Sequence, residues 1–572
     1  MKNIPLYEVR HINSLKGMLE SSVKLFSNKA AFLVKNNETD TYEPITYKQF
    51  YQEVEWLGTA FIDMGLGSKR IALIAENRYE WAVSYLAAVN GTPIIVPIDK
   101  ELPQNEIENL IRKSQASAVI FSGNKRDDIL NISPNLDFVD FYIDMDADES
   151  KDNFLSFREL LEKGRRLVQT GDSRFKDVEI DVEAMRILLF TSATTDKSKA
   201  VMLCHRNICS NLMDMVSMTY IGPDDIFLSV LPLHHTYECT CGFLCPLYCG
   251  SAVAFCEGLR HIPKNLQQSK ATVMLGVPLI FEAMYRRIWN QASKKPGMSR
   301  KLRVAVILSN FLRMFNINIT KKVFSPIHDT FGGNIRLFVS GAAGIDPQVA
   351  KGFRDFGIAF IQGYGLTECS PIVALNRDVD FKDSSAGLPL PNIQIKIDKP
   401  DSEGVGEILV KGPSIMLGYY DSSVDNKKAF EGGWFHTGDL GYMDKEKFVY
   451  ITGRKKNVIV TKNGKNIYPE EIETLLNRSP YIKECLVYGD KDPNSGDVAV
   501  SAEILPDMDY IEEKFKENIP SQQEIHIMIQ NEIKAVNKSL VIYKHIKHFN
   551  LREDEFAKTT TKKIKRYLEI NK

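Results

Sequence analysis

The chain has no long uninterrupted hydrophobic run. Its longest apolar stretch, roughly residues 242–256, is broken by Pro246 and Gly250 and is too short to cross a bilayer. Residues 1–17 contain no continuous apolar core and do not have the pattern of a secretory signal peptide. We therefore expect a cytoplasmic protein without a transmembrane segment, and we leave peripheral membrane contact open.

An excess of charge of either sign is also absent. The chain has 72 lysines and arginines against 73 aspartates and glutamates, which gives a net charge of −1. A net charge so close to zero provides no general attraction to nucleic acid, and we therefore expect no nucleic-acid partner. The hydrophobic content of 44% is ordinary for a folded protein, but 572 residues are too many for one core. Two or more domains are expected.

The nine cysteines lack the C-x2-C spacing that is typical of zinc sites. Five of them lie between Cys239 and Cys256, and Cys241, Cys245 and Cys249 would share one face of a helix. One interpretation is a metal or iron–sulfur site. The spacing favours the other, in which free cysteines act as small buried side chains in a reducing compartment.

Short apolar runs alternate with helical stretches through the first two thirds of the chain. Residues 70–77, 93–99, 117–123 and 335–341 are such runs, and each ends in turn residues. This alternation predicts an α/β fold with parallel layers. Helical periodicity over residues 45–63 follows a Thr46 cap.

The texture changes toward the C-terminus. After Ala386, short strands and Gly/Pro turns predict a β-rich subdomain, and beyond Arg454 a smaller unit with a helix after Pro469 begins. We expect a large N-terminal domain at residues 1–453 and a small α+β domain at residues 454–572. The segment 506–523 is predicted to be a loop.

An acid and an arginine suited to a sugar lie in residues 433–473. Thr437-Gly438-Asp439 is predicted to form a tight turn, and an apolar strand then leads into Gly453-Arg454-Lys455-Lys456. A fixed carboxylate can accept hydrogen bonds from both hydroxyls of a ribose, and an arginine can donate to the same sugar or to a phosphate. The glycine and lysines that flank Arg454 indicate a joint.

A run of hydroxyls with a lysine follows the apolar strand 186–190. It comprises Thr191, Ser192, Thr194, Thr195 and Lys199. Hydroxyl and backbone N–H groups can donate to phosphate oxygens, and lysine supplies positive charge. The loop does not fit G-x-x-x-x-G-K-[ST], so a Walker-type NTPase is not indicated. Taken alone, such a loop is also typical of a solvated turn.

Two further segments end strands. The segment 362-QGYGLTECSP-371 follows one strand, and its glycines are predicted to make a tight turn before Thr367 and Glu368. Gly341-Ala342-Ala343 follows another strand. A flat aromatic ring can cover a base, small residues let that base approach the backbone, and a carboxylate suits Mg²⁺ shared with phosphates.

Histidine and lysine supply two further candidates. His235 lies in 231-LPLHHTYE-238, before the cysteine-rich segment, and Lys563 lies in the C-terminal run 557-AKTTTKKIKRYL-568. A lone histidine is more often structural, and a terminal lysine run is more often a solvated tail.

In this order and spacing, the segments resemble the motifs of acyl-adenylate-forming enzymes. These enzymes are the acyl-CoA synthetases, luciferases and peptide-synthetase adenylation domains. The resemblance covers residues 15–572. The phosphate loop matches T-S-G-T-T-G-x-P-K-G at five positions, residues 364–368 match Y-G-x-T-E, and residues 557–566 match P-K-T-x-x-G-K-I-x-R at Lys558, Thr559, Lys563, Ile564 and Arg566.

The resemblance implies a role for each candidate. The ATP phosphates would be held by Thr191, Ser192, Thr194, Thr195 and Lys199, and the α-phosphate would be held by Thr367. The adenine would be held by Gly341, Ala342, Ala343, Tyr364 and Gly365, and the ribose by Asp439 and Arg454. The Mg²⁺ ion would be bound by Thr194 and Glu368. Lys563 would be the catalytic lysine, Lys456 the hinge of a mobile C-terminal domain, and His235 part of the acyl pocket.

The expected activity is that of a long-chain fatty acid–CoA ligase. Such an enzyme forms an acyl-adenylate from ATP and a carboxylic acid, and then a thioester with coenzyme A. An acyl carrier protein is an alternative acceptor. The loop departs from the family pattern at Ala193, Asp196 and Ala200, where glycine would permit close approach of phosphate. A catalytically weakened nucleotide-binding protein is therefore a second alternative.

Overall fold

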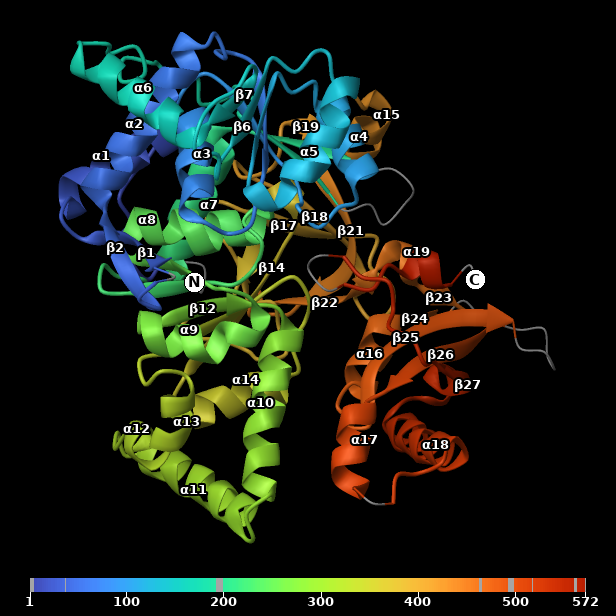
Figure 1. Cartoon of the computed structure of the whole chain (residues 1–572). Helices are drawn as coiled ribbons and strands as arrows, with labels where there is room; N and C mark the ends of the chain where they lie inside the picture. The colour runs from blue at the N-terminus through green and yellow to red at the C-terminus, as the bar shows by residue number, and fades with distance from the viewer. Residues whose placement is uncertain are drawn as a thin grey trace. The chain divides into compact units, whose positions relative to one another are not determined.

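The computed structural model divides into two compact units (Figure 1), which we describe separately. It describes residues 5–36, 38–191, 199–461, 465–491, 498–516, 518–559 and 563–570. Among these, the first unit contains the residues up to 191 together with 199–394 and 410–435. The second contains 395–409 and the residues from 436 onward.

Two large sheets with mostly parallel strands form the first unit. One has the strand order β19-β9-β8-β4-β3-β5-β6-β7, and the other has the order β16-β15-β14-β13-β12-β10-β11-β1-β2. The strands of the first sheet are β19 Gly418–Tyr419, β9 Ala200–Leu203, β8 Ile187–Phe190, β4 Ile94–Pro97, β3 Arg70–Ile74, β5 Ala118–Phe121, β6 Phe141–Asp144 and β7 Phe154–Ser156. Those of the second are β16 Leu388–Pro389, β15 Ile372–Leu375, β14 Ala359–Gly365, β13 Leu337–Ser340, β12 Val273–Gly276, β10 Ile226–Ser229, β11 Ala252–Phe255, β1 Ala30–Asn36 and β2 Thr41–Thr46.

Amphipathic helices cover these sheets. In α4 the side chains of Ile107, Leu110 and Ile111 are buried against Val96 and Phe121 of the first sheet, as the 3–4 spacing of an amphipathic helix requires. The helices of this unit are α1 Leu15–Phe26, α2 Tyr47–Asp63, α3 Tyr79–Val89, α4 Gln104–Ser114, α5 Arg126–Ile132, α6 Phe157–Gln169, α7 His205–Met218, α8 Cys245–Cys249, α9 Ile262–Ser269, α10 Pro278–Ser293, α11 Met298–Arg313, α12 Thr320–Val323, α13 Ser325–Thr330, α14 Pro347–Asp355 and α15 Ser423–Ala429.

The predicted cap of α2 is present. The backbone N–H of Gln49 donates to Thr46 Oγ1 at 3.2 Å, and the backbone N–H of Thr46 donates to Gln49 Oε1 at 2.9 Å. This reciprocal pair is a capping box, which satisfies donors that the first helical turn would leave unbonded.

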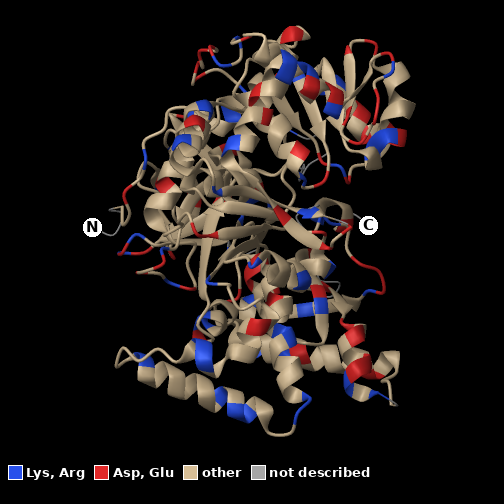
Figure 2. Ribbon diagram, turned by 60° about the vertical axis from the view of Figure 1, so that its left-hand side comes forward, with Lys and Arg blue, Asp and Glu red and all other residues tan. Residues whose placement is uncertain are grey.

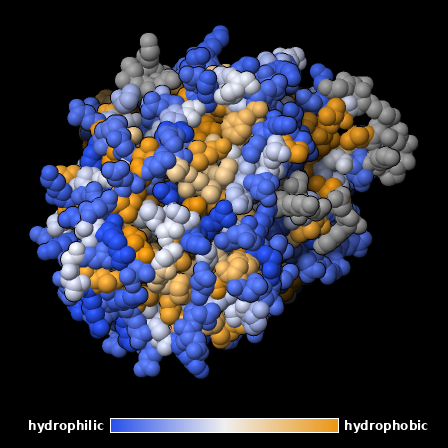
Figure 3. All heavy atoms as spheres, turned by 90° about the horizontal axis from the view of Figure 1, so that it is seen from above, coloured by the Kyte–Doolittle hydropathy of each residue, from blue (hydrophilic) through white to orange (hydrophobic). Residues whose placement is uncertain are grey.

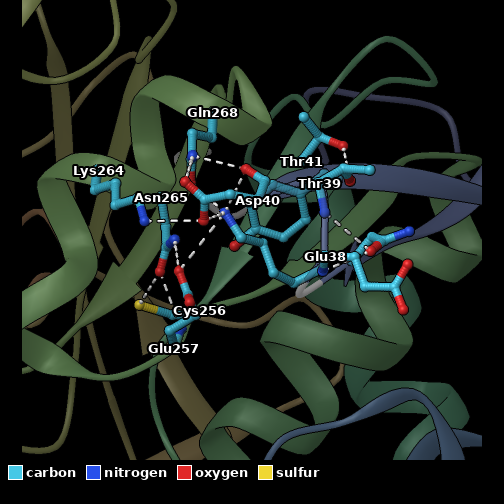
Figure 4. Close-up of polar contacts among 12 residues, drawn as sticks. Glu38, Thr39, Asp40, Thr41, Cys256, Glu257, Lys264, Asn265 and Gln268 are labelled. Carbon is cyan, nitrogen blue, oxygen red and sulfur yellow. Dashed lines mark hydrogen bonds and ion pairs between the residues drawn. The ribbon is translucent and has the colours of Figure 1, made fainter.

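A polar hub joins the β1–β2 turn to α9 (Figure 4). The carboxylate of Asp40 lies 2.8 Å from the ammonium of Lys35 and 2.9 Å from that of Lys264, and it accepts a hydrogen bond from Gln268. These donors hold the pKa of Asp40 below its usual value. Asp40 has a φ of 54°, in the left-handed region that aspartate tolerates better than most residues.

The second unit contains most of a five-stranded sheet and a smaller α+β layer. The five-stranded sheet has the order β17-β18-β21-β20, with β22 paired to β21, and the smaller layer contains the sheet β25-β26-β27. Its strands are β17 Gln394–Asp398, β18 Gly406–Lys411, β21 Trp434–Met443, β22 Val449–Arg454, β23 Ile459–Val460, β24 Asn466–Ile467, β25 Ile482–Lys491, β26 Val498–Pro506 and β27 Ile546–Leu551. The residues of β20, Phe430–Glu431, are assigned to the first unit. The helices are α16 Pro469–Leu476, α17 Met508–Phe515, α18 Gln522–Ser539 and α19 Arg566–Glu569.

The loop predicted at 506–523 is wrong at residues 508–515, which form α17. The side chain of Asp507 accepts a hydrogen bond from the backbone N–H of Tyr510 and caps this helix. Ile511 is fully buried in the core beside Ile525 of α18 and Ile482 of β25. Phe515 of the same helix is partly buried against this core, so the cap and two apolar contacts stabilise a short helix whose sequence pattern is weak.

The predicted fold class is confirmed, with parallel α/β layers in a large unit and a smaller α+β unit. The cysteines are free thiols, and Cys239, Cys241 and Cys245 are buried as small apolar side chains. No helix within the described ranges combines the length and the apolar character that crossing a membrane requires.

Close packing of α2 on α6 gives a test of the core. A Cβ atom added at Gly164 of α6 would lie 1.9 Å from the backbone oxygen of Trp56 in α2, so Gly164→Ala must push the two helices apart. We expect a loss of about 1–3 kcal/mol in the free energy of unfolding, measured by urea denaturation. The matched control is Gly17→Ala in α1, where the new Cβ meets only Ser14 Oγ at an ordinary 3.4 Å. Equal stability of the two variants would contradict the packing described.

Candidate active site

Two predicted segments lie together at the carboxyl edge of the second sheet. Strands β13 and β14 are parallel neighbours, with Ser340 opposite Gln362, so the residues that follow β13 lie beside the end of β14. Gly341, Ala342 and Ala343 are thereby brought to the same edge as Tyr364 and Gly365. The carboxyl ends of parallel strands are where α/β sheets usually bind ligands.

Glycine is required at position 341 by a close contact. An added Cβ would lie 2.7 Å from the ring of Tyr237, whose hydroxyl donates to the backbone oxygen of Val339 at 3.0 Å. Ala342 has a φ of 71°, which is strained for a residue with a side chain. The edge is therefore held in a conformation that local sequence preference does not favour.

The predicted glycine turn at residues 362–365 is wrong. These residues complete β14, where Gly363 and Tyr364 pair with Leu375 and Ala374 of the antiparallel strand β15. A Cβ at Gly365 would lie 2.1 Å from the backbone oxygen of Pro371, so close strand packing requires this glycine. The turn comes after it, at the short 3-10 helix Thr367–Cys369.

Glu368 is fixed from a distant part of the chain. Its Oε1 accepts a hydrogen bond of 2.8 Å from the hydroxyl of Tyr419, and its backbone oxygen accepts one from the N–H of Met416. Burial, and then the negative charge of Glu368, raise the pKa of Tyr419 well above its usual range. The tyrosine therefore stays a hydrogen-bond donor, and it holds the carboxylate in one orientation.

Lys199 lies against the same tyrosine. Its ammonium is 4.7 Å from the ring centroid of Tyr419 and 3.0 Å from Asp425 Oδ1. The backbone N–H of Thr191 donates to the oxygen of Lys199 at 2.9 Å and closes the base of the loop. Ser192, Thr194 and Thr195 lie outside the described residues. Of the predicted phosphate and metal residues, Lys199 and Glu368 are thus brought to one tyrosine.

Glu368 provides a single hard oxygen ligand of the kind that Mg²⁺ accepts. Within the described part of the chain, no three Asp, Glu, His or Cys side chains come together as a metal site. This arrangement fits a Mg²⁺ ion that takes its other ligands from phosphates and water, and it does not fit a resident metal held by protein alone.

His235 lies at the start of the π-helix Tyr237–Leu244. The backbone N–H of His235 donates to the oxygen of Pro232, and its ring is 4.1 Å from that of His234. His234 lines a small cavity together with Leu189 and Cys239, whereas His235 does not line it. Burial lowers the pKa of His234 to about 3, with a smaller contribution from the charge of Lys100, so this neighbour is neutral.

Asp439 and Arg454 face each other in the second unit. They are directly opposite across β21 and β22, and Arg454 Nε lies 2.6 Å from Asp439 Oδ1. The turn predicted at Thr437-Gly438-Asp439 is wrong, because all three residues lie inside strand β21. Gly438 nevertheless has a φ of 69°, and it is this kink that the sequence signalled.

Thr437 fixes the kink. Its hydroxyl donates to the backbone oxygen of Ile408 at 2.7 Å and accepts from the N–H of Asp439 at 3.0 Å. Glu407 accepts from the N–H of Gly438 and lies 2.8 Å from the ammonium of Lys455. The buried carboxylate of Asp439 is therefore positioned by backbone bonds on both sides.

The charges of Asp439 and Arg454 act on a third predicted residue, Lys563. Although the residue as a whole is exposed, protein atoms desolvate its ammonium and lower its pKa to about 8. The positive charge of Arg454 acts in the same direction, and the negative charge of Asp439 opposes it. Backbone and hydroxyl bonds between Thr559 and Lys563 close the loop that carries this lysine.

Lys456 lies in the 3-10 helix Lys455–Asn457 that follows Arg454. Burial lowers the pKa of Lys456, and the charges of Arg454 and Arg566 lower it further. The second unit thus brings together four predicted residues, Asp439, Arg454, Lys456 and Lys563.

Two segments of the chain match descriptions of known protein families. Residues 19–420 match the family described as AMP-binding enzyme, and residues 456–570 match the AMP-binding enzyme C-terminal domain. The chain belongs to the AMP-binding enzyme family. This confirms the family that the motifs indicated.

The relatives of this AMP-binding enzyme include ligases of fatty acids. Fatty acyl-CoA synthetase A of Dictyostelium discoideum is 28% identical over 549 residues, which cover 91% of this chain and 79% of that protein. Long-chain-fatty-acid–CoA ligase 1 of Homo sapiens is 29% identical over 504 residues, which cover 81% of this chain and 70% of that protein. The crystal structure of an anthranilate CoA ligase in complex with anthranoyl-AMP matches the fold with a TM-score of 0.78 at 20% identity, covering 100% of this chain and 98% of that chain.

Tyr419 is the residue of this AMP-binding enzyme that sequence reasoning missed. It lies in a two-residue strand, β19, which pairs with β9 and so brings Tyr419 opposite Val201. Nothing local in 418-GYYD-421 marks the first tyrosine over Tyr420. Only the antiparallel pairing of β19 with the strand after the phosphate loop would have indicated it.

The charges around Lys563 give a second test. Arg454→Gln should raise the pKa of Lys563, and Asp439→Asn should lower it further, because the two charges act in opposite directions. The measurement is an NMR pH titration of ¹³C-methylated lysines, with the Lys563 signal assigned by its loss in Lys563→Arg. Shifts of the same sign in the two variants would contradict the arrangement.

Proposed function

We propose that this enzyme activates a fatty acid with ATP and transfers the acyl group to coenzyme A. The observation that carries the proposal is the alignment with fatty acyl-CoA ligases over most of the chain. The separate clustering of the two sets of predicted residues supports it. The acid class, and CoA as acceptor, come from the names of those relatives.

The reaction would have two halves. A carboxylate oxygen attacks the α-phosphorus of ATP, the bond to the β-phosphate breaks, and acyl-AMP and pyrophosphate form. The sulfur of coenzyme A then attacks the acyl carbon, the bond to the AMP oxygen breaks, and the thiol proton is released to solvent. The protein contributes position and charge, as is usual in phosphate chemistry.

In this proposal each group of residues has one task. Lys199 and Thr367, with Thr191, Ser192, Thr194 and Thr195, hold phosphate oxygens. Glu368, held by Tyr419, and Thr194 bind Mg²⁺, which neutralises phosphate charge when bound. Tyr364, Gly365 and residues 341–343 hold the adenine, Asp439 and Arg454 hold the ribose, His235 lines the acyl pocket, and Lys563 stabilises charge at the α-phosphate.

We also propose a domain boundary at residues 453 and 454, with Lys456 in the hinge. The two family matches support it, since one ends at residue 420 and the other begins at 456. A short segment after a strand end can absorb the backbone rotation that a hinge needs. The free thiols support a cytoplasmic location.

Pyrophosphate release over acids from short to long, including aromatic ones, tests the proposed reaction. We expect turnover that increases with chain length and products that carry CoA. ATP binding without turnover on any acid would favour a nucleotide-binding protein. Transfer to acyl carrier protein in preference to CoA would move the enzyme to the other acceptor class.

Tyr419→Phe tests the contact that holds Glu368. The change removes one hydrogen bond to a charged group and leaves the ring over Lys199, so we expect roughly a tenfold loss in kcat/KM for Mg·ATP in pyrophosphate release. Tyr420→Phe is the matched control, since the hydroxyl of Tyr420 accepts from Arg70 instead. The proposed role fails if the two variants behave alike.

Lys563→Ala tests the catalytic lysine. Adenylate formation should fall by roughly 10²–10³-fold, the usual cost of one preorganised electrostatic donor, while transfer from supplied acyl-adenylate should change little. Lys565→Ala, two residues along the same loop, is the control. Adenylate formation by the unmodified enzyme should also decline as the pH rises through about 8, where Lys563 loses its proton. Equal losses in both halves would show that Lys563 does not act in the first half alone.

A further inference from the structure

Helix α11 of the first unit exposes its large apolar side chains to solvent, whereas a core helix would bury them. Val304, Ile307, Leu308, Phe311, Met314 and Phe315 at and just beyond this helix are all exposed, Ile307 by 69% and Met314 by 79%. Their spacing of three and four residues places them along one stripe. The one buried residue of α11 is a serine, Ser309.

Polar contacts attach the opposite face of α11 to the protein. The side-chain amide of Asn310 donates to Asp355 Oδ1 at 2.9 Å, and Arg313 donates to the backbone oxygen of Arg354 at 3.2 Å. A helix that is held by polar contacts and presents six large apolar side chains to water has an unfavourable solvation free energy. We infer from this cost that another apolar surface covers the exposed side chains of α11.

Positive charge surrounds this apolar stripe. Residues 283–328 contain ten lysines and arginines and no aspartate or glutamate, in a chain whose net charge is −1. Arg300, Lys301 and Arg303 in the first turns of α11, and Lys321 and Lys322 in α12, are exposed. In Figure 2, where α11 lies at the lower edge, the helix carries blue segments and no red ones.

A view of the protein from above shows a mixed pattern. On the face seen in Figure 3, hydrophobic residues are interspersed with hydrophilic ones. A surface helix with an apolar stripe and basic flanks is typical of one that lies in the interface of a lipid bilayer. Nucleic acid would match the charge, but it would leave six apolar side chains in water.

We propose that α11 and the residues up to Phe315 dock onto an anionic lipid surface. The apolar stripe enters the boundary between head groups and acyl chains. The exposed basic residues pair with lipid phosphates, and they are Arg300, Lys301, Arg303, Lys321 and Lys322. Docking of this kind needs neither ATP nor turnover, so it stands independently of the proposed reaction. The even overall charge conceals it, because the basic residues are concentrated in one segment.

Co-sedimentation of the full chain with vesicles tests this docking. We expect binding to vesicles of phosphatidylcholine with 30% phosphatidylglycerol, and binding at least tenfold weaker to phosphatidylcholine alone and in high salt. The triple change Ile307→Ser, Phe311→Ser and Phe315→Ser removes apolar area without touching the core, and Arg300→Gln with Lys301→Gln and Arg303→Gln removes charge. Each should reduce binding to anionic vesicles at least tenfold.

Matched controls distinguish binding through this surface from non-specific binding to vesicles. Val541→Ser with Ile542→Ser removes apolar side chains that are exposed by 52% and 83% elsewhere, and Lys427→Gln with Lys428→Gln removes exposed charge. Both should bind vesicles as the unmodified chain does, and all variants should keep its unfolding transition and its pyrophosphate release on a water-soluble acid.

Other occupants of the stripe are distinguishable outcomes. Unchanged vesicle binding by the triple serine variant would overturn the proposal. So would binding of a labelled DNA duplex, without binding to vesicles, that is lost in the glutamine variant. Dimers in light scattering that are abolished by the serine variant, with no vesicle binding, would assign the stripe to a second copy of the chain.

Discussion

The pairing register of β21 and β22 is the constraint on which the chemistry of the second unit depends. It places a carboxylate directly opposite a guanidinium, and the 2.6 Å contact between Asp439 and Arg454 follows from backbone pairing alone. A one-residue slip of either strand would turn its side chain to the other face of the sheet and separate the pair. Burial is the main cause of the lowered pKa of Lys563, and the register fixes the positions of the two charges that modify it in opposite directions.

The first unit uses a different device for the same purpose. There the sheet edge supplies positions, through the parallel neighbours β13 and β14, and one tyrosine from far along the chain joins them. Tyr419 donates to Glu368 and lies under Lys199, so a carboxylate and an ammonium are held near each other without direct pairing. The ion pair of Lys199 is made with Asp425, at 3.0 Å, and Glu368 is held by the hydroxyl of Tyr419.

Much of this could be predicted from the sequence, for reasons that differ between elements. The apolar runs that became β3, β4 and β5 are buried on both sides, so their pattern is strong. The turns expected at 362–365 and 437–439 are strands, because antiparallel pairing with a partner outside the local window overrides glycine's preference for turns. Helix α17 was missed because Ile511 is its one fully buried residue, with Phe515 partly buried beside the same core.

The site follows the same division. Motif spacing indicated candidate residues that are neighbours in the chain, such as Thr367 and Glu368. It could not find Tyr419, whose task depends on the pairing of β19 with β9. Nor could it reveal the outward stripe of α11, since periodicity shows that a helix has an apolar face but not which way that face points.

The basic segment around α11 also changes how the molecule behaves in an electric field. The whole chain has a net charge of −1 and residues 283–328 carry +10, so the remaining residues together carry −11. A net charge near zero therefore conceals a basic segment in an otherwise acidic chain, and we expect this segment to lead the approach to an anionic surface. The chain's isoelectric point of about 6.8 is thus an average over two oppositely charged parts, and it describes neither of them.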